Sequence, residues 1–278
     1  MQRRGPAFWL LTGFFALFVL FLYGPTITIT ILSFQGPSGG LTFPMRGLSL
    51  YWFGNLFEKQ MVGDFAGSFQ RSIVLGLATM VVTVLVSFSA GLAFRKRFHG
   101  STVIFYLAIA SLIVPSILIS LGIGLLFRVM EVDTAWYSSA FGAHLTWTLP
   151  FGLLIMFAVF NRFDRRYEEA ARDLGATSWQ TVRHVIVPIV LPSLIGVGLF
   201  GFTLSYDEFA RSLYTAGTFN TLPLEIYGMT TNVTTPVLYA LGTFTTGLSF
   251  LVIALALVST IVVRRRRERH GSDAGKAA

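Results

Sequence analysis

The stretch SIVLGLATMVVTVLVSFSAGLAF, residues Ser72–Phe94, holds 23 residues without an Asp, Glu, Lys or Arg. An α-helix rises about 1.5 Å per residue, so about 20 apolar residues cross the hydrocarbon core of a bilayer. This stretch is therefore predicted to be a membrane-spanning helix. It runs into Arg95-Lys96-Arg97, a basic cluster of the kind that follows a span on the cytoplasmic side.

Five further uncharged runs are at least as long as this one. They are Gly5–Met45, Phe98–Phe127, Thr134–Asn161, His184–Tyr206 and Ile226–Val263. Turn signals within the first and last runs, GPSGG at 36–40 and TTNVTTP at 230–236, mark where loop replaces helix. The predicted fold is thus an all-α integral membrane protein, one domain over residues 1–278. Its six spans are expected near 8–33, 72–94, 101–127, 136–160, 190–211 and 238–263.

The composition excludes the other broad classes. The chain of 278 residues is 54% hydrophobic and only 12% charged, and its mean hydropathy is +0.68. A soluble core of this length cannot hide so much apolar surface, and a disordered chain needs low hydrophobicity and abundant charge. Because the sequence has no cysteine, disulfides, thiolate nucleophiles and cysteine-built metal sites are excluded as well.

The distribution of basic residues orients the chain. With the first residues inside, 16 of the 21 Lys and Arg residues fall in cytoplasmic segments and five fall outside. This asymmetry follows the positive-inside rule and predicts that both termini are cytoplasmic. The run Arg264–Arg267 directly follows an apolar helix, so it is interpreted as an anchor facing anionic lipid rather than a nucleic-acid site. The first run is too long for a signal peptide and is expected to be retained as a span.

No catalytic or nucleotide-binding motif accompanies these spans. The sequence contains neither H-E-x-x-H nor G-x-S-x-G, and no Walker A loop. His144, at the expected outer end of the fourth span, is interpreted as a structural histidine with its hydrogen bonds satisfied. The protein is therefore predicted not to be an enzyme, and nucleotide-driven work would have to come from another subunit.

The cytoplasmic loop at 162–188 departs from the pattern because nine charges crowd into Arg162–Arg183. Asp164 can cap a helix. One face of that helix would be an apolar stripe formed by Tyr167, Ala170, Ala171 and Leu174, which are spaced i, i+3, i+4 and i+7. On its charged face, Glu168 and Arg172 have the spacing of an ion pair.

Turn signals continue after this helix. Gly175 suits the left-handed position that ends a helix, and Thr177–Gln180 has the spacing of a capping box that starts a second one. Pro188 and Pro192 are expected to limit how the second helix joins the fifth span. The loop can lie on lipid or dock a protein. Its nearly balanced charge and its alanine-rich stripe favour the protein dock.

The order of residues in this loop resembles a known family. Glu169-Ala170-Ala171, three residues, Gly175, nine residues and then Val185-Ile186-Val187-Pro188 is similar to the EAA motif of permease subunits of binding-protein-dependent ABC importers. The chain differs from that pattern by one valine for isoleucine and one valine for leucine. The resemblance implies the type I ABC importer permease fold, a location in the bacterial inner membrane, and a loop that acts as the coupling helix.

The resemblance also implies partners and site residues. The expected partners are a second permease subunit, an ATPase dimer that binds ATP and Mg, an extracytoplasmic binding protein, a small solute and lipid. No cofactor in this chain and no nucleic acid are expected. The residues expected to couple to the ATPase are Tyr167, Glu168, Glu169, Ala170, Ala171, Asp173, Leu174, Gly175 and Pro188.

Three strings resemble the second permease subunit of spermidine/putrescine importers. They are YEEAARDLGA at 167–176, LSYDEF at 204–209 and TLPLEIYGM at 221–229. Permeases for thiamine, ferric iron and phosphonates share parts of them, so these solutes stay open. An ATP-independent secondary transporter or channel is the alternative from another class.

Tyr206, Asp207 and Glu208 are the candidates for the substrate path. Carboxylates at membrane depth usually face a cavity or a partner, and with an aromatic neighbour they suit a polycation. The alternative is that one carboxylate pairs with Arg211 on the same helix. Neighbouring helical residues point about 100° apart, so at most one of the two carboxylates is expected to face the path.

Two further features of the sequence, a group of aromatic residues and two prolines, give weaker predictions. The aromatic residues between Arg46 and Arg71 are interpreted as an interfacial belt, with a dock for a substrate-carrying protein as the alternative. Pro115 and Pro150 lie within the third and fourth runs, where they are expected to kink helices.

Overall fold

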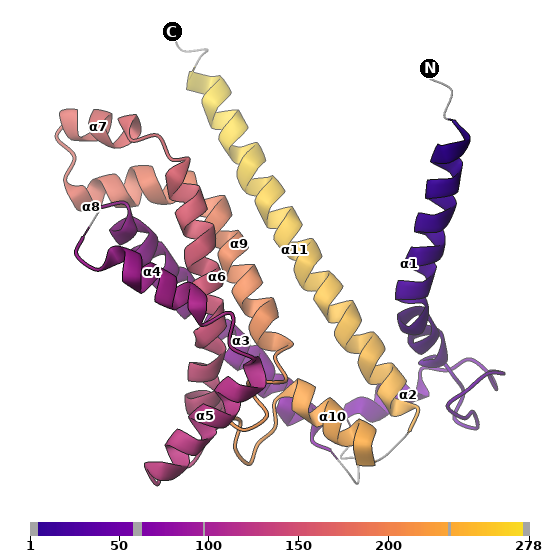
Figure 1. Cartoon of the computed structure of the whole chain (residues 1–278). Helices are drawn as coiled ribbons and strands as arrows, with labels where there is room; N and C mark the ends of the chain where they lie inside the picture. Colours follow the sequence, from indigo (N-terminus) through magenta and orange to yellow (C-terminus); the bar gives the residue numbers. More distant parts are fainter. Residues whose placement is uncertain (1–4, 58–62, 97, 233–234, 275–278) are drawn as a thin grey trace. The chain divides into compact units, whose positions relative to one another are not determined.

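A computed structural model describes residues 5–57, 63–96, 98–232 and 235–274 of the chain. These residues are predominantly helical (Figure 1). The helices are α1 (Pro6–Leu32), α2 (Tyr51–Gly54), α3 (Phe65–Phe94), α4 (Ser101–Ala110), α5 (Ser116–Val129), α6 (Phe141–Asn161), α7 (Arg166–Asp173), α8 (Ser178–Thr181), α9 (Val187–Tyr206), α10 (Leu222–Asn232) and α11 (Val237–Ala274), with a 3₁₀ turn at Asn55–Phe57 and π-helical turns at Trp136–Ala140 and Val182–Ile186. Outside the description lie Arg3, Arg4, Glu58, Lys59, Arg97, Lys276, residues 233–234 of the expected loop, and the side chains of Arg264–Arg267.

Four of the described helical segments are long and apolar enough to cross a membrane. They are Pro6–Leu32, Phe65–Phe94, Trp136–Asn161 and Ser178–Tyr206. The segment expected as the third span, 101–127, forms two shorter helices, α4 and α5. The sixth expected span, 238–263, lies within α11. The count of six spans and the side on which the termini lie stay predictions.

The two prolines expected to kink helices behave differently. α4 ends at Ala110, and Pro115 precedes α5 in an extended backbone conformation. Pro115 has no N–H to donate into a preceding turn, so the helix breaks before it. Pro150 lies inside α6 without interrupting that helix. The polar Ser111 within the break donates a hydrogen bond from Oγ to the Thr146 carbonyl of α6, at 3.0 Å.

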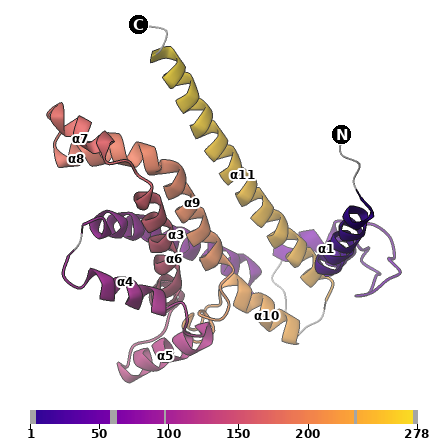
Figure 2. The same cartoon turned by 45° about the horizontal axis from the view of Figure 1, so that its top comes forward.

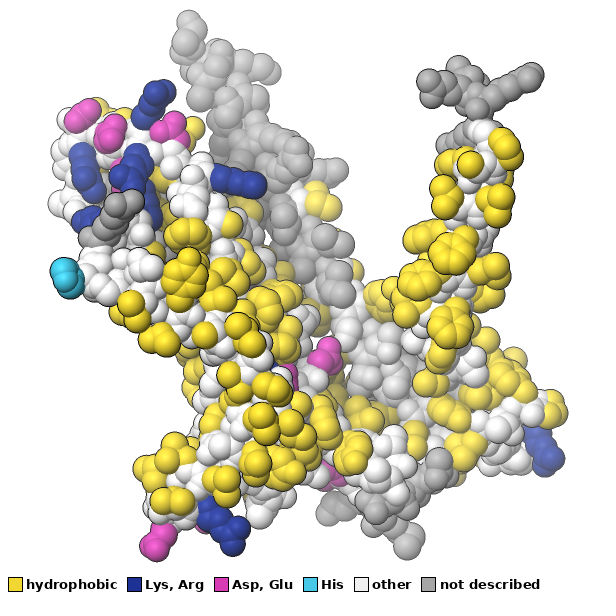
Figure 3. All heavy atoms as spheres, in the orientation of Figure 1, with side chains coloured by type: hydrophobic (Ala, Val, Ile, Leu, Met, Phe, Trp, Pro, Cys, Tyr) yellow, Lys and Arg dark blue, Asp and Glu magenta, His cyan; other side chains and the backbone are white. Residues whose placement is uncertain are grey.

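The chain forms two compact units, and the first comprises Met1–Ala66 and Ile226–Leu251. Within it, Tyr239 Oη donates a hydrogen bond to the Leu41 carbonyl at 2.8 Å, and the Phe65 and Phe244 rings meet edge to face with centroids 6.0 Å apart. Exposed apolar side chains occupy successive positions along α1, among them Phe14, Phe15, Leu17 and Phe18, and Figure 3 shows apolar side chains on the face of α1 in view. This surface requires lipid or another protein as its neighbour.

The second unit, Gly67–Glu225 and Val252–Ala278, is built on α3, α6 and α9 (Figure 2). Its core consists of Met156, Phe160, Ile186, Val190, Leu194 and Val197, with Val84, Phe88 and Leu92 of α3 packed against it. A Cβ added at Gly152 of α6 would lie 2.2 Å from Ser87 Oγ of α3. Glycine therefore lets α3 and α6 approach closely, as small residues do between membrane helices.

Candidate functional site

Helix α7 begins one residue later than a cap at Asp164 predicts, because its N-cap is Arg165, which makes no side-chain capping hydrogen bond. The backbone N–H of Arg166 donates to Asp164 Oδ1 at 3.0 Å. Glu168 and Glu169 lie in the first turn and Arg172 in the last turn, so their charges complement the helix dipole. Together these local interactions stabilise a helix of only eight residues.

The end of α7 is a Schellman motif. Gly175 has φ +85°, its N–H donates to the Arg172 carbonyl at 2.8 Å, and the N–H of Ala176 donates to the Ala171 carbonyl at 3.0 Å. A left-handed backbone is open to glycine without a Cβ penalty. The glycine thus reverses the chain after α7, as its position in the sequence predicts.

The capping box before α8 is confirmed. Thr177 Oγ1 accepts from the Gln180 N–H at 3.3 Å, and Gln180 Oε1 accepts from the Thr177 N–H at 2.8 Å. From α8 the chain stays helical through the π-helical turn into α9. Pro188 lies in the first turn of α9, just after the π-helical turn, and Pro192 lies inside α9, yet the helix continues past both prolines. The expectation that these prolines limit how the second helix joins the fifth span is therefore wrong.

The apolar stripe of the loop lies open. Tyr167 is 57% exposed and Leu174 is 90% exposed, and Trp179 of α8 is 69% exposed. Figure 3 shows Lys, Arg, Asp and Glu side chains gathered over the end of the unit formed by α7 and α8. A surface of exposed apolar residues with charges of both signs around it is typical of a protein interface.

Glu168 pairs with a different arginine from the one its spacing suggests. The Glu168 carboxylate forms an ion pair with Arg95, which directly follows α3. The guanidinium of Arg95 also lies over the rings of Phe160 and Phe163. Local spacing favours Arg172 as the partner, but the fold brings the end of α3 against α7.

At the C-terminal end of α9, the three candidates for the substrate path, Tyr206, Asp207 and Glu208, differ in exposure. α9 ends at Tyr206, five residues before the expected end of the fifth span. Tyr206 is buried and stacks on Phe202, with centroids 5.7 Å apart. Glu208 is buried, whereas Asp207 is exposed. The structure therefore separates the two carboxylates.

The buried Glu208 pairs with Arg211, which is 1% exposed. Glu208 Oε1 accepts from the Arg211 N–H at 2.8 Å, and Oε2 lies 3.7 Å from the Arg211 guanidinium. The guanidinium also donates to Ser116 Oγ at 2.7 Å and Thr146 Oγ1 at 3.2 Å, and lies 4.5 Å from the Trp147 ring centroid. Sequence reasoning named Arg211 only as an alternative partner and missed these contacts with α5 and α6.

The structural interpretation of His144 is confirmed. This histidine is fully buried, with Nδ1 2.7 Å from Ser205 Oγ and Nε2 2.9 Å from Ser212 Oγ. Other short polar side chains bind the loop after α9: Tyr214 N–H donates to Ser120 Oγ at 2.9 Å, Ser139 Oγ donates to the Thr215 carbonyl at 2.7 Å, and Leu222 N–H donates to Ser72 Oγ at 2.8 Å. Hydrogen bonds from α3, α5, α6 and the π-helical turn before α6 thus hold this loop.

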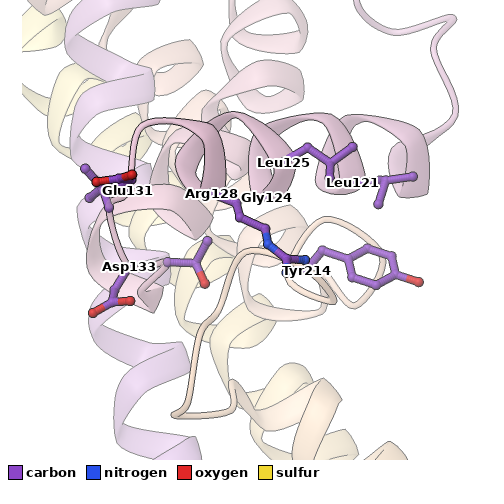
Figure 4. Close-up of a pocket in the computed structure, with 9 residues that line it drawn as sticks. Leu121, Gly124, Leu125, Arg128, Glu131, Asp133 and Tyr214 are labelled. Atoms are coloured by element: carbon purple, nitrogen blue, oxygen red, sulfur yellow. The ribbon is translucent and has the colours of Figure 1, made fainter.

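An open cavity of about 610 Å³ lies between α5 and this loop (Figure 4). Arg128 of α5 extends toward Tyr214, whereas Glu131 and Asp133 lie on the turn that follows α5. The sequence analysis singles out none of these four residues as a site, because Tyr214 lies far from the other three in the chain and no motif joins them.

Comparison with known proteins identifies the chain's relatives. Residues 83–268 match the family model of binding-protein-dependent transport system inner membrane components. The chain is 28% identical over 264 residues to the spermidine/putrescine transport system permease protein PotC of Haemophilus influenzae, covering 95% of this chain and 99% of that protein. It is 28% identical over 239 residues to the putrescine transport system permease protein PotI of Escherichia coli K12, covering 82% of each.

A solved structure shares the fold. The match is to a bacterial ABC transporter involved in the import of the acidic polysaccharide alginate, with a TM-score of 0.63 and 16% identity, covering 97% of this chain and 99% of the other. At this identity the likeness shows the fold alone.

Proposed function

Because the chain belongs to the family of binding-protein-dependent transport system inner membrane components, we propose that it forms half of the translocation pathway of an ATP-driven importer for a polyamine. It is a multi-pass protein of the bacterial inner membrane and a permease subunit. The observation that carries the coupling role is the exposed helix–glycine–helix of α7 and α8. It presents the EAA-like residues, with Ala170 exposed and Ala171 half-buried.

The proposed topology has six spans with both termini in the cytoplasm. In it, α4 and α5 together form one interrupted crossing, and α11 forms the last. The basic residues at the end of α3 and in the α6–α9 loop support this orientation, since basic residues favour the cytoplasmic side.

The proposed complex contains a second permease subunit, an ATPase dimer that binds ATP and Mg, and an extracytoplasmic binding protein. The family description names dependence on a binding protein. The apolar side chains of Tyr167, Leu174 and Trp179 offer the ATPase a surface to bury. ATP binding in the ATPase would then move α7 as a rigid element.

A polyamine is proposed as the substrate because the relatives PotC and PotI are permeases of spermidine and putrescine transport systems, and because one acid, Asp207, is exposed. Asp207 lies at the end of α9 beside the buried Tyr206. A carboxylate at this depth can form charge-assisted hydrogen bonds with the ammonium groups of a polyamine. Glu208 and Tyr206 would support this site from within the fold.

Reconstitution tests this function. The chain, copurified with its ATPase and second permease, is placed in liposomes and supplied with the binding protein, and uptake of labelled spermidine, putrescine, thiamine and phosphonate is measured with and without ATP. ATP-dependent uptake of a polyamine supports the proposal. Uptake by the purified chain alone, without ATP, would instead indicate a secondary transporter or channel.

Removing the charge of Asp207 is expected to weaken polyamine transport. Asp207→Asn keeps the shape but loses one charge-assisted hydrogen bond, so the apparent KM for spermidine should rise about tenfold, since tenfold corresponds to about 1.4 kcal/mol. The matched control is Glu131→Gln, which neutralises another exposed acid and should leave KM unchanged. An unaltered KM in Asp207→Asn would remove this residue from the path.

Charge changes on the exposed face of α7 are expected to uncouple the complex. Glu169→Lys with Ala170→Asp should abolish uptake, because the partner surface would meet reversed and added charge on the helix it binds. The protein should still insert, since both side chains are exposed. The measurements are uptake, membrane level and ATPase copurification. Normal uptake in this variant would refute the coupling role of α7.

A further inference from the structure

Arg95 connects the cytoplasmic end of α3 to α7 by several contacts at once. Its guanidinium pairs with Glu168, and the side chains of both residues are only 13% exposed. The guanidinium lies 5.3 Å from the ring centroid of Phe160, at the end of α6, and 5.2 Å from that of Phe163. In addition, the Arg165 guanidinium donates to the Arg95 carbonyl at 3.3 Å. Arg95 thus contacts residues of α7, the end of α6 and the loop between them.

These contacts hold one end of α7 and leave the other open. Glu168 lies in the first turn of the helix, and the Tyr167 ring lies 6.3 Å from that of Phe163. Leu174, at the opposite end, is 90% exposed. The N-terminal end of α7 is therefore bound to the helical core, whereas its C-terminal end is exposed and available to a partner.

The pairing is also a link between distant parts of the chain. Arg95 and Glu168 are 73 positions apart, whereas α7 is joined through the backbone only to α6 and α8. The Arg95–Glu168 contact is therefore a direct side-chain route from α7 to α3, in addition to the indirect route through α6, against which α3 packs. A planar guanidinium suits this role, because it binds a carboxylate with its edge while its face stacks on aromatic rings.

We propose that Arg95 and Glu168 form a latch through which a displacement of α7 moves the cytoplasmic end of α3. The latch rests on the proposed function, since the partner ATPase supplies the displacement. Arg95 is then a positioning residue: it touches neither the solute nor nucleotide, but it converts movement of the coupling helix into movement of a spanning helix. Loss of the latch should leave ATP hydrolysis running while transport falls.

A covalent replacement of the ion pair gives the sharpest test, because the natural chain has no cysteine. Arg95→Cys with Glu168→Cys is reconstituted with the partner subunits, and spermidine uptake per ATP hydrolysed is measured before and after treatment with a short bifunctional maleimide. We expect the ratio to fall at least fivefold before treatment and to recover to at least half of the wild-type value after it. Each single cysteine variant should show no recovery.

Either of two results would overturn the latch. One is a wild-type ratio of uptake to ATP hydrolysis in the double cysteine variant before cross-linking. The other is a ratio that stays low or falls further after the two cysteines are cross-linked. Glu168→Gln provides a milder variant of nearly the same shape, and its ratio should fall at least threefold; an unchanged ratio also contradicts the latch. Lys96→Ala, which removes the exposed neighbouring cation, is the control and should match the wild type.

Failure of the proposed function is distinguishable from failure of the latch. If the wild-type complex shows no ATP-driven uptake, the proposed function is wrong and the latch falls with it. If the wild type transports normally and the cysteine and glutamine variants keep its ratio of uptake to hydrolysis, the latch alone is wrong.

Discussion

Replacing the buried Arg211 by methionine is expected to destabilise the protein more than any other single change at the described sites. The change leaves Glu208 buried without its cation and removes donors to Ser116 and Thr146. Breaking a buried pair in this way costs about 3–5 kcal/mol. Since each kcal/mol corresponds to about 2–4 °C in a chain of this size, the melting temperature of the detergent-purified protein should fall by roughly 10 °C.

Two further variants sharpen this expectation. Arg211→Met with Glu208→Gln removes both charges, so it should recover part of the lost melting temperature. Arg128→Met removes an exposed cation and should leave the melting temperature within about 2 °C of the wild-type value, because surface substitutions have small effects on stability. A double variant as unstable as Arg211→Met alone would show that the ion pair is not the source of the effect.

Gly175→Val is expected to reduce uptake at least tenfold while membrane insertion stays normal. The backbone at Gly175 has φ +85°, a region that costs an L-residue about 1–2 kcal/mol and a β-branched one more. A Cβ at this position meets no atom within 4 Å, so the strain comes from the backbone alone. The chain can relieve this strain by turning differently between α7 and α8, which would disturb the surface proposed for the ATPase.

Gly175→Asn is the matched control, because asparagine tolerates the left-handed backbone better than other side chains. It should retain most uptake. Uptake, membrane level and the amount of copurified ATPase are measured for both variants. Equal activity of the valine and asparagine variants would mean that the turn geometry at this position has no part in coupling.

The elements of the coupling loop were predictable because they depend on near neighbours. The cap at Asp164, the glycine turn at Gly175 and the capping box at Thr177–Gln180 each involve hydrogen bonds within five positions of one another. Such interactions recur wherever the same residues occur at the same spacing. The structure contains the glycine turn and the capping box where the sequence indicates them, whereas Asp164 lies one residue before the N-cap of α7 and binds the Arg166 N–H.

The partners of charged side chains were less predictable. Spacing suggests Arg172 for Glu168, but the fold supplies Arg95. Spacing equally allows Asp207 or Glu208 to pair with Arg211, and only the structure shows that Glu208 is the buried partner. The reason in both cases is burial, which depends on which helices pack together and not on the order of residues along one helix.

The sequence by itself determined that this is a helical membrane protein, because the length of hydrophobic runs and the scarcity of charge are properties of contiguous residues. It also located the loop that carries the EAA-like motif, because the local caps and turns of that loop depend on near neighbours. The tertiary structure alone decided that Arg211 joins α5, α6 and the loop after α9, and that Arg95 contacts α7. These outcomes required residues far apart in the chain to meet, and the free energy of such contacts depends on burial that no single segment possesses.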